Sequence, residues 1–153
     1  MILYTPAPED LWFKERMLSD PETMSYNHAY GGTIPFPREK WAAWHDRWVA
    51  HPADKRFYRY LQLEDGTFVG ETAYRTDEER GIILADVIVH AKYRGNGYGG
   101  TGLELLCRAA KENGMDVLYD EIAADNPAVS LFLRHGFTEE YRTNEIIMLK
   151  KYL

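Results

Sequence analysis

Hydrophobic residues follow two different periods along the chain, and the change of period divides it into elements. Between residues 8 and 50, apolar and aromatic positions recur at helical spacing, and Trp41, Trp44 and Trp48 share one stripe. From residue 56 the period is two, and Asp65-Gly66 marks a hairpin turn between two strands. We predict a short strand at 2–4, helices at 8–18, 20–31 and 38–50, and strands at 56–63 and 67–75.

A continuous apolar run at residues 82–89 indicates a buried strand, and it leads into the sequence Arg94-Gly95-Asn96-Gly97-Tyr98-Gly99-Gly100. Helical spacing resumes directly afterwards, at Leu103, Leu106 and Ala110. The glycines therefore lie on a strand-to-helix turn. Such a turn directs backbone N–H groups and a helix N-terminus at one point, which suits a phosphate or diphosphate. Glycine is needed where a ligand approaches the backbone closely, and Arg94 adds guanidinium donors beside the amides.

The last third of the chain continues as strand, helix and strand pair. We predict a strand at 117–123, a helix that begins at Asn126-Pro127 and ends at His135-Gly136, and two strands at 137–142 and 145–152. Two strands joined by a helix of this length form a right-handed parallel crossover. We expect one domain, residues 1–153, of the α/β (α+β) class.

Composition excludes several classes of function. The chain has 153 residues, a net charge of -6 and no run rich in lysine or arginine, which argues against a nucleic-acid partner. The single cysteine, Cys107, excludes an internal disulfide and is expected to be a buried thiol. No segment resembles a signal peptide or a membrane span, so we expect a cytoplasmic protein without a membrane partner. No histidine pair has metal-ligand spacing with a third ligand nearby, so we expect no metal.

The glycine-rich stretch supports competing interpretations. Gly95, Gly97 and Gly100 spell G-x-G-x-x-G, the dinucleotide fingerprint, and Asp120 lies where its acidic partner falls. The same stretch also spells R-x-x-G-x-G, from Arg94 to Gly99, and so resembles the pyrophosphate loop of the GNAT N-acetyltransferases, which bind acetyl-coenzyme A (acetyl-CoA). A third interpretation is a turn that only packs a helix on a strand.

A second segment strengthens the resemblance to the GNAT family. Residues 126–137, Asn-Pro-Ala-Val-Ser-Leu-Phe-Leu-Arg-His-Gly-Phe, are similar to the family's second motif, which ends in a Gly-Phe pair. The resemblance implies a GNAT fold: a mixed, mostly antiparallel central sheet of six to seven strands, flanked by about four to five helices. A dinucleotide-binding fold expects its fingerprint early in a largely parallel sheet, whereas here the glycines come after antiparallel hairpins.

The resemblance also implies roles for individual residues. Gly95, Asn96, Gly97, Tyr98, Gly99 and Gly100 would hold the pyrophosphate by backbone amides, with Arg94 beside them. Val87, Ile88 and Val89 would pair with the pantetheine arm as an added strand and polarise the thioester carbonyl. This requires the strand to splay away from the strand at 117–123.

Two positions depart from the family pattern. Counting back from Gly136-Phe137, Phe132 occupies the place of a tyrosine that protonates the leaving thiolate in many members. Asp125 stands where the family has an asparagine, and the neighbouring Asn126 either contacts the cofactor or only caps its helix.

A transferase also needs to deprotonate its amine. If the hairpin at 77–81 is symmetric, Arg75 pairs with Ile82 and Glu71 with Asp86, and both carboxylates point to one face of the sheet. Our hypothesis is that Glu71 is the base and that Asp86 holds the substrate cation; the alternative is two solvated or arginine-paired carboxylates. Five aromatic residues either line an acceptor pocket through cation–π contacts or form core: Tyr26, Tyr30, Phe36, Trp41 and Trp44.

The sequence thus predicts transfer of an acetyl group from acetyl-CoA to a primary amine of a small molecule or peptide, by direct attack in a ternary complex. The alternatives are a coenzyme A sensing module without turnover, which Phe132 keeps open, and an NAD(P)-dependent oxidoreductase. The acceptor amine is left open, and the protein is expected to be a monomer or homodimer.

Overall fold

In the computed structural model, the backbone is described for residues 1–153 and the side chains for all residues except Ala29 and Tyr30; within this described backbone, seven strands form one sheet. Their spatial order is β1-β2-β3-β4-β5-β7-β6. β4 and β5 run parallel, as the crossover rule predicted, and the other neighbouring pairs are antiparallel. The strands are β1 (Ile2–Tyr4), β2 (Phe57–Gln62), β3 (Phe68–Asp77), β4 (Ile82–Val89), β5 (Val117–Ala123), β6 (Thr138–Arg142) and β7 (Ile146–Tyr152).

The helices occupy the predicted places, but those before β2 are short and broken. Proline or a glycine pair interrupts the chain between them, and brief segments of this kind often adopt the tighter 3-10 form. The α-helices are α1 (Trp12–Ser19), α2 (Trp41–His45), α3 (Tyr98–Glu112) and α4 (Ala128–Arg134). The 3-10 segments are η1 (Pro8–Asp10), η2 (Thr23–Tyr30), η3 (Arg38–Lys40) and η5 (Ala91–Tyr93), and η4 (Asp46–Ala50) is a π-helical turn.

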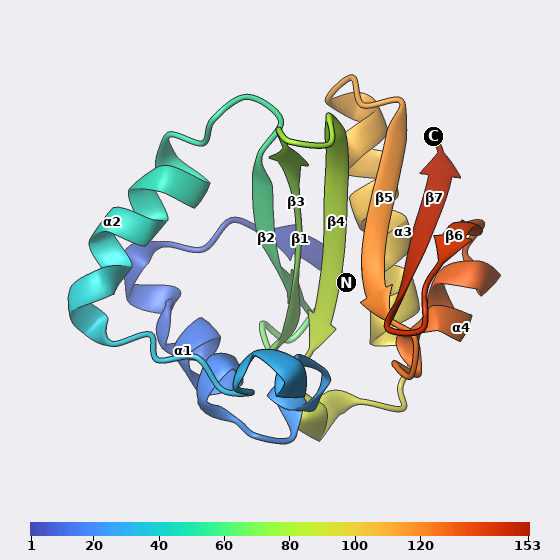
Figure 1. Cartoon of the computed structure of the whole chain (residues 1–153). Helices are drawn as coiled ribbons and strands as arrows, with labels where there is room; N and C mark the ends of the chain where they lie inside the picture. Colours follow the sequence, from blue (N-terminus) through green and yellow to red (C-terminus); the bar gives the residue numbers. More distant parts are fainter.

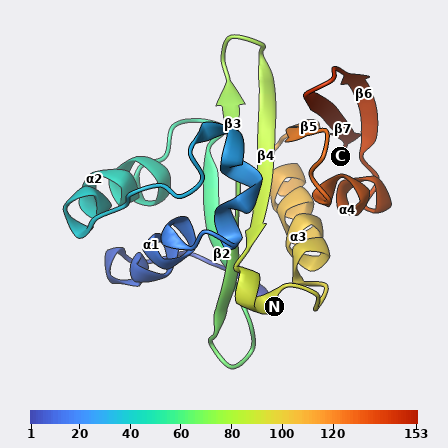
Figure 2. The same cartoon turned by 60° about the horizontal axis from the view of Figure 1, so that its bottom comes forward.

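Helices cover both faces of the sheet, and each face has its own core. On one face, Leu103 and Leu106 of α3 and Phe132 of α4 pack with residues of β4, β5 and β7. On the other face, residues of α1, η2 and α2 pack on Tyr58, Tyr60 and Ala73 of β2 and β3. Figures 1 and 2 show α1 and α2 on one side of the sheet and α3 with α4 on the other. The predicted α+β fold, with a mixed, mostly antiparallel sheet of six to seven strands, is confirmed, and the described sheet has seven.

The register between β3 and β4 differs from the prediction. Asp77, not Arg75, lies opposite Ile82, so Ala73 lies opposite Asp86 and Glu71 opposite Ile88. The hairpin turn is tighter than predicted, because β3 continues to Asp77 instead of ending at residue 75, while β4 begins at Ile82 as predicted. A shift of two residues preserves the side of the sheet on which each side chain lies. Glu71 and Asp86 are therefore diagonal neighbours on one face rather than directly opposed.

Candidate active site

β4 and β5 separate soon after they begin. In the described backbone, Leu84 opposite Tyr119 is the one register pair between them, although β4 continues to Val89 and β5 to Ala123. This is the splay that the sequence analysis required but had no means of detecting. It leaves one side of the second half of β4 without a neighbouring strand.

Alternation along β4 decides which backbone groups face this gap. The amide of His90 donates to the carbonyl of Val69 on β3, at 2.9 Å, so the backbone groups of the even-numbered β4 residues face β3. Those of Val87 and Val89 face the gap. The prediction that Ile88 also pairs with the cofactor through its backbone needs correction, because Ile88 pairs with Glu71 of β3.

The glycine bend at the end of β4 combines left-handed backbone with open space. Gly95 and Gly97 have φ angles of 84° and 80°, and a Cβ on either would meet no described atom within 4 Å. Glycine is thus required there by conformation, and the space in front stays available to a ligand. A Cβ on Gly100 would lie 2.7 Å from Nε2 of His135, the residue that follows α4, so the imidazole ring would have to move. The amides at the start of α3 lack intrahelical partners, an arrangement that suits an anion.

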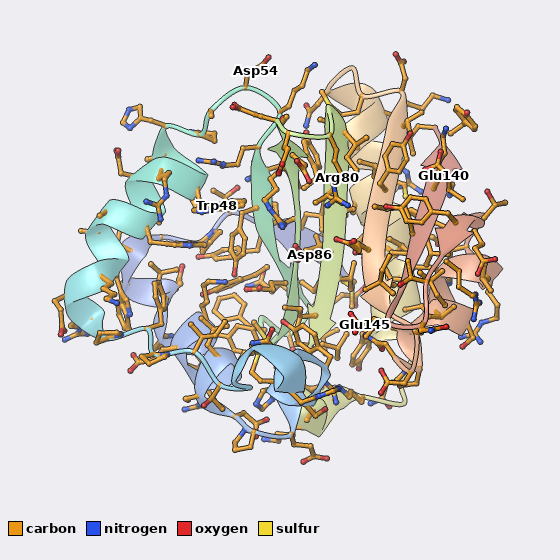
Figure 3. The ribbon with its side chains drawn as sticks, in the orientation of Figure 1. Trp48, Asp54, Arg80, Asp86, Glu140 and Glu145 are labelled. Carbon is orange, nitrogen blue, oxygen red and sulfur yellow. The ribbon has the colours of Figure 1, made fainter. Side chains whose placement is uncertain are left out.

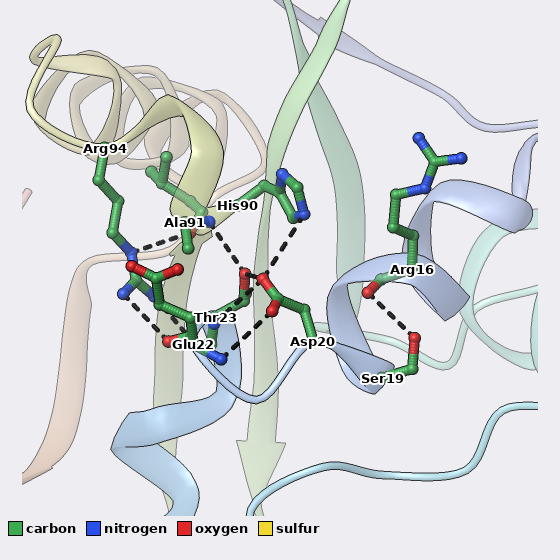
Figure 4. Close-up of polar contacts among 9 residues, drawn as sticks. Arg16, Ser19, Asp20, Glu22, Thr23, His90, Ala91 and Arg94 are labelled. Atoms are coloured by element: carbon green, nitrogen blue, oxygen red, sulfur yellow. Dashed lines mark hydrogen bonds and ion pairs between the residues drawn. The ribbon is translucent and has the colours of Figure 1, made fainter.

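The Arg94 side chain does not point into the bend. Its guanidinium donates to the carbonyls of Val89 at 3.2 Å, Glu22 at 3.3 Å and Thr23 at 2.9 Å (Figure 4). This corrects the expectation that its fork stands beside the phosphate-binding amides. Arg94 instead ties η2 to the end of β4.

A second set of contacts in Figure 4 reinforces this tie. The amide of Ala91 donates to Oγ1 of Thr23 at 2.9 Å, and that hydroxyl donates to Oδ2 of Asp20 at 2.5 Å. Nε2 of His90 lies 3.7 Å from the same carboxylate oxygen, and burial lowers the pKa of His90. The segment before α2 is therefore held against the strand that leads into the glycine bend.

The structure shows what Asn126 and Phe132 contact at α4. Oδ1 of Asn126 accepts from the amide of Ala128 at 2.9 Å, so this side chain caps α4. Phe132 is 3% exposed and packs edge-on against Phe137, with ring centroids 5.0 Å apart. The ring at the family's tyrosine position is part of the core.

On the opposite face of the sheet from α3, a cavity of about 160 Å³ lies between β3, β4 and the helices α1 and α2. Trp44, Trp48 and Tyr58 form its aromatic wall, and Figure 3 shows Trp48 on η4 and Asp86 on β4. Four charged residues complete the lining: Lys14, Glu71, Arg75 and Asp86. A larger cavity, of about 240 Å³, lies near Gly81 and Gly114, at the ends of β4 and β5 remote from the glycine bend.

Glu71 is fully engaged by its neighbours. Nζ of Lys14 lies 3.0 Å and 3.2 Å from its two carboxylate oxygens, and the hydroxyl of Tyr58 also donates to it. The side chains of Lys14 and Glu71 are only 11% and 6% exposed. Nζ of Lys14 further lies 4.9 Å and 4.8 Å from the ring centroids of Trp44 and Tyr58. The lysine thus neutralises Glu71 and lies over the ring of Trp44, one of the five aromatic residues named as possible lining for a substrate cation.

Asp86 is the carboxylate that remains available. Its side chain is 38% exposed, and its Oδ2 lies 3.7 Å from Nη1 of Arg75. Loss of hydration, and secondly repulsion from Glu71, raise the pKa of Asp86 to about 6. On β5, one residue after the last pair with β4, burial raises the pKa of Asp120 well above its ordinary value, and the charge of Asp86 adds to this effect.

Sequence reasoning missed the parts of this site that come from distant elements. No local pattern indicated that Lys14 contacts Glu71, because the two residues are 57 positions apart in the sequence. Asp120 was noted only as a possible dinucleotide ligand. Phe36 and Trp41 are core residues, Trp44 lines the cavity, and the Tyr30 side chain lies outside the described part. Loss of hydration, and secondly the charges of Glu71 and Asp86, raise the pKa of the Tyr26 hydroxyl.

Two further observations bear on the expected partners. Among the described residues, no group of three or more His, Cys, Asp or Glu side chains is arranged to hold a metal ion. In the same part of the chain, no helix has the length and apolar character needed to cross a membrane.

Comparisons with known proteins agree with this geometry. The sequence profile of the Acetyltransferase (GNAT) family matches residues 12–137. Among curated proteins, none matches the chain. Among solved structures, the GNAT-family acetyltransferase from Streptococcus pneumoniae superposes with a TM-score of 0.77 at 17% identity, covering 99% of both chains.

Two other solved structures illustrate the range of matches. The ribosomal-protein-alanine N-acetyltransferase from Brucella melitensis has a TM-score of 0.74 at 22% identity, over the full length of both chains. The protein yncA from Salmonella typhimurium, solved with its cofactor acetyl-CoA, has a TM-score of 0.74 at 20% identity, over 100% of this chain and 94% of its own. At these identities, the structures establish the shared fold, and the family profile, matched over most of the sequence, establishes membership. The chain therefore belongs to the GNAT acetyltransferase family and is an acetyl-CoA-dependent N-acetyltransferase.

Proposed function

We propose that this enzyme transfers the acetyl group of acetyl-CoA to the primary amine of a small molecule, by direct attack within a ternary complex, with Asp86 as the base. The observation that carries the proposal is the position of Asp86. It lies on β4 beside the gap, in a cavity on the face opposite α3, and its pKa of about 6 suits proton uptake near neutral pH. The cavity's 160 Å³ is below the roughly 300–1,000 Å³ of pockets for drug-sized ligands, which favours a small acceptor.

The cofactor side of the proposal rests on backbone groups. The amides of residues 95–100 would bind the diphosphate of acetyl-CoA, at the bend where Gly95 and Gly97 leave open space. The pantetheine arm would add to β4 as a strand, because the backbone groups of Val87 and Val89 face the gap. One of these N–H groups would also polarise the thioester carbonyl. Asn126 remains a proposed cofactor contact through the amide nitrogen that its cap leaves over.

This proposal changes the roles that we first assigned to the two carboxylates. Glu71 already accepts from Lys14 and Tyr58, so its oxygens are occupied and its charge is compensated. Asp86 has no hydrogen bond of this kind, since its nearest arginine nitrogen is 3.7 Å away. We therefore assign proton removal to Asp86 and the positioning of the cavity wall to Glu71 with Lys14.

The leaving thiolate also needs a proton, and Phe132 has none to give. Asp120 is our candidate donor, because burial and the nearby charge of Asp86 raise the pKa of its carboxyl group and so favour the protonated form. It follows the last β4–β5 pair directly, so it stands where the two strands part. Asp86 ionised and Asp120 protonated would then form an acid–base pair from two carboxyl groups.

One experiment tests the proposed acceptor class. Release of the coenzyme A thiol is measured with a panel of small amines, while thermal shift reports binding of acetyl-CoA. Amine-dependent thiol release at steady state supports transfer to a small-molecule amine. Binding of acetyl-CoA without thiol release for any of these amines would contradict the proposal.

A further inference from the structure

The charges in the acceptor cavity balance, and this restricts the acceptor. Lys14 and Arg75 contribute two positive charges, and Glu71 and the ionised form of Asp86 contribute two negative ones. Lys14 and Glu71 neutralise each other inside the wall, at 3.0 Å. Arg75 and Asp86 are what a ligand would meet. A polyamine would bring two or more positive charges to a site with one available carboxylate and one arginine, at an uncompensated cost.

Arg75 and Asp86 are close without being bonded. Nη1 of Arg75 lies 3.7 Å from Oδ2 of Asp86, whereas a charge-assisted hydrogen bond measures about 2.7–2.9 Å. Their side chains are 45% and 38% exposed. Both groups therefore keep capacity to bind a ligand that carries one charge of each sign on neighbouring atoms. The guanidinium is a planar fork of donors that fits a carboxylate with two parallel bonds.

The order of residues along the strands gives the ligand a direction. Asp86 lies opposite Ala73. Arg75 is two residues further along β3, on the side away from the glycine bend, and lies opposite Leu84. An amine on Asp86 would thus face the half of β4 assigned to the thioester, and a carboxylate on Arg75 would lie on the remote side. The rings of Trp44 and Trp48 also line the cavity, so an apolar side chain of the ligand would contact them there.

From this juxtaposition we infer that the acceptor is a free α-amino acid with an apolar or aromatic side chain, its carboxylate bound by Arg75 and its amine by Asp86. The inference rests on the proposed function and names the substrate class for the same site. In the reaction, Asp86 takes a proton from the ammonium and passes it to solvent, and the amine lone pair forms a bond to the thioester carbon. The carbon–sulfur bond then breaks, and the thiolate takes a proton from Asp120. The new amide nitrogen gives its second proton to Asp86, from which it returns through solvent to Asp120. The products are the N-acetyl amino acid, coenzyme A and one proton released to solvent.

Arg75 would assist this chemistry as well as binding. A fixed positive charge beside the bound amine disfavours its protonated form and so lowers the pKa of the amine. A lower pKa increases the fraction of the bound amine that is neutral and can act as a nucleophile. The same charge penalises a second ammonium group on the substrate.

The test compares matched pairs of acceptors that differ only in the carboxylate. The kcat/KM for thiol release is measured with L-phenylalanine against 2-phenylethylamine and with L-leucine against 3-methylbutylamine, and spermidine serves as a polycation. We expect each amino acid to exceed its decarboxylated partner by roughly 10- to 100-fold, the range for a hydrogen-bonded charge that is lost. Arg75→Gln should abolish that preference, and Arg75→Lys should retain part of it.

The matched control is Arg59→Gln. Arg59 lies on β2, where its guanidinium donates to the carbonyl of Tyr58 at 2.7 Å and packs over Phe57, and it does not line the cavity. This change should leave the ratio between amino acid and amine as it is. Equal rates for the two members of each pair, or a preference that survives Arg75→Gln, would overturn the inference while acetyl transfer stands. Thiol release with none of the acceptors would overturn the proposed function, and the inference with it.

Discussion

The two halves of the candidate site use different chemical groups, backbone in one and side chains in the other. The half assigned to acetyl-CoA, from β4 through the glycine bend to α3, offers backbone groups, and its glycines serve conformation, open space or packing. The half assigned to the amine offers side chains, which come from α1, α2, η4, β2, β3 and β4. A backbone site depends on the local path of the chain. A side-chain site depends on contacts between elements that are distant in sequence.

This difference teaches why a short motif revealed one half and not the other. Within seven residues, the glycine pattern specifies a bend that binds a diphosphate in many different sequences. The acceptor half has no such pattern, because Lys14, Trp44 and Glu71 meet only after the sheet has formed. If the comparison is correct, changes in each half should affect one substrate and spare the other.

The largest effect is expected from Asp86→Asn, which removes the proposed base from the acceptor half. The kcat/KM of the wild-type enzyme should rise with pH and level off above about 6, because only ionised Asp86 accepts a proton. The asparagine variant should lose roughly 10²- to 10⁴-fold in kcat, the usual contribution of a general base. Its kcat/KM should also no longer rise with pH. Asp65→Asn, the same change in the β2–β3 turn, is the control. A normal pH profile in Asp86→Asn would contradict the assignment.

Next in size is Glu71→Gln, which leaves the Lys14 ammonium buried without its partner. We expect the free energy of unfolding to fall by about 3–5 kcal/mol, measured by chemical denaturation, as for a broken buried pair. The double variant with Lys14→Met should recover most of this loss. Because Glu71 raises the pKa of Asp86, the acidic limb of the pH profile should also move below 6. Disappearance of that limb in a folded variant would instead restore Glu71 as the base.

In the cofactor half, Gly97→Ala should weaken acetyl-CoA binding about tenfold, since its Cβ would enter the open space of the bend. Gly66→Ala is the matched control, because Gly66 also has a positive φ, of 91°, and open surroundings. Both variants should lose about 1–2 kcal/mol of stability to backbone strain. Titration calorimetry with acetyl-CoA should separate them. Equal affinity in the two variants would remove the bend from the cofactor site.

The smallest effect is expected from Arg94→Gln, and it tests where the boundary between the halves lies. The guanidinium ties η2 to the end of β4 through carbonyls, so its loss should loosen the acceptor side. We expect KM for the amine to rise roughly 3- to 10-fold, in keeping with the net value of one or two partly exposed hydrogen bonds. The Kd for acetyl-CoA should change less. A larger change in the Kd for acetyl-CoA than in the KM for the amine would indicate that the Arg94 side chain binds the diphosphate.

Local pattern was sufficient to predict the strands, the parallel crossover and the position of the glycine bend. It also predicted that Glu71 and Asp86 share a face, because an error of two residues in register does not change sides. The roles of the two carboxylates were not predictable. They depend on Lys14 and Tyr58, which neutralise one carboxylate, and on the burial that raises the pKa of the other.

The direction of the Arg94 side chain was unpredictable for a related reason. Its partners are carbonyl groups, which every residue carries, so no residue type in η2 marks the contact. The splay of β5 from β4 was likewise required by the resemblance and invisible in the composition of either strand. In both cases, the deciding interaction is made by backbone atoms brought together by the fold.

A structure of the enzyme with bound coenzyme A tests the central claim most directly, because it places the cofactor relative to both halves. The account predicts that the diphosphate lies on the amides of residues 95–100, that the pantetheine arm pairs with Val87 and Val89 in the gap, and that Asp86 lines the space beyond the sulfur. A diphosphate bound away from this bend, or a pantetheine arm outside the gap between β4 and β5, would contradict it.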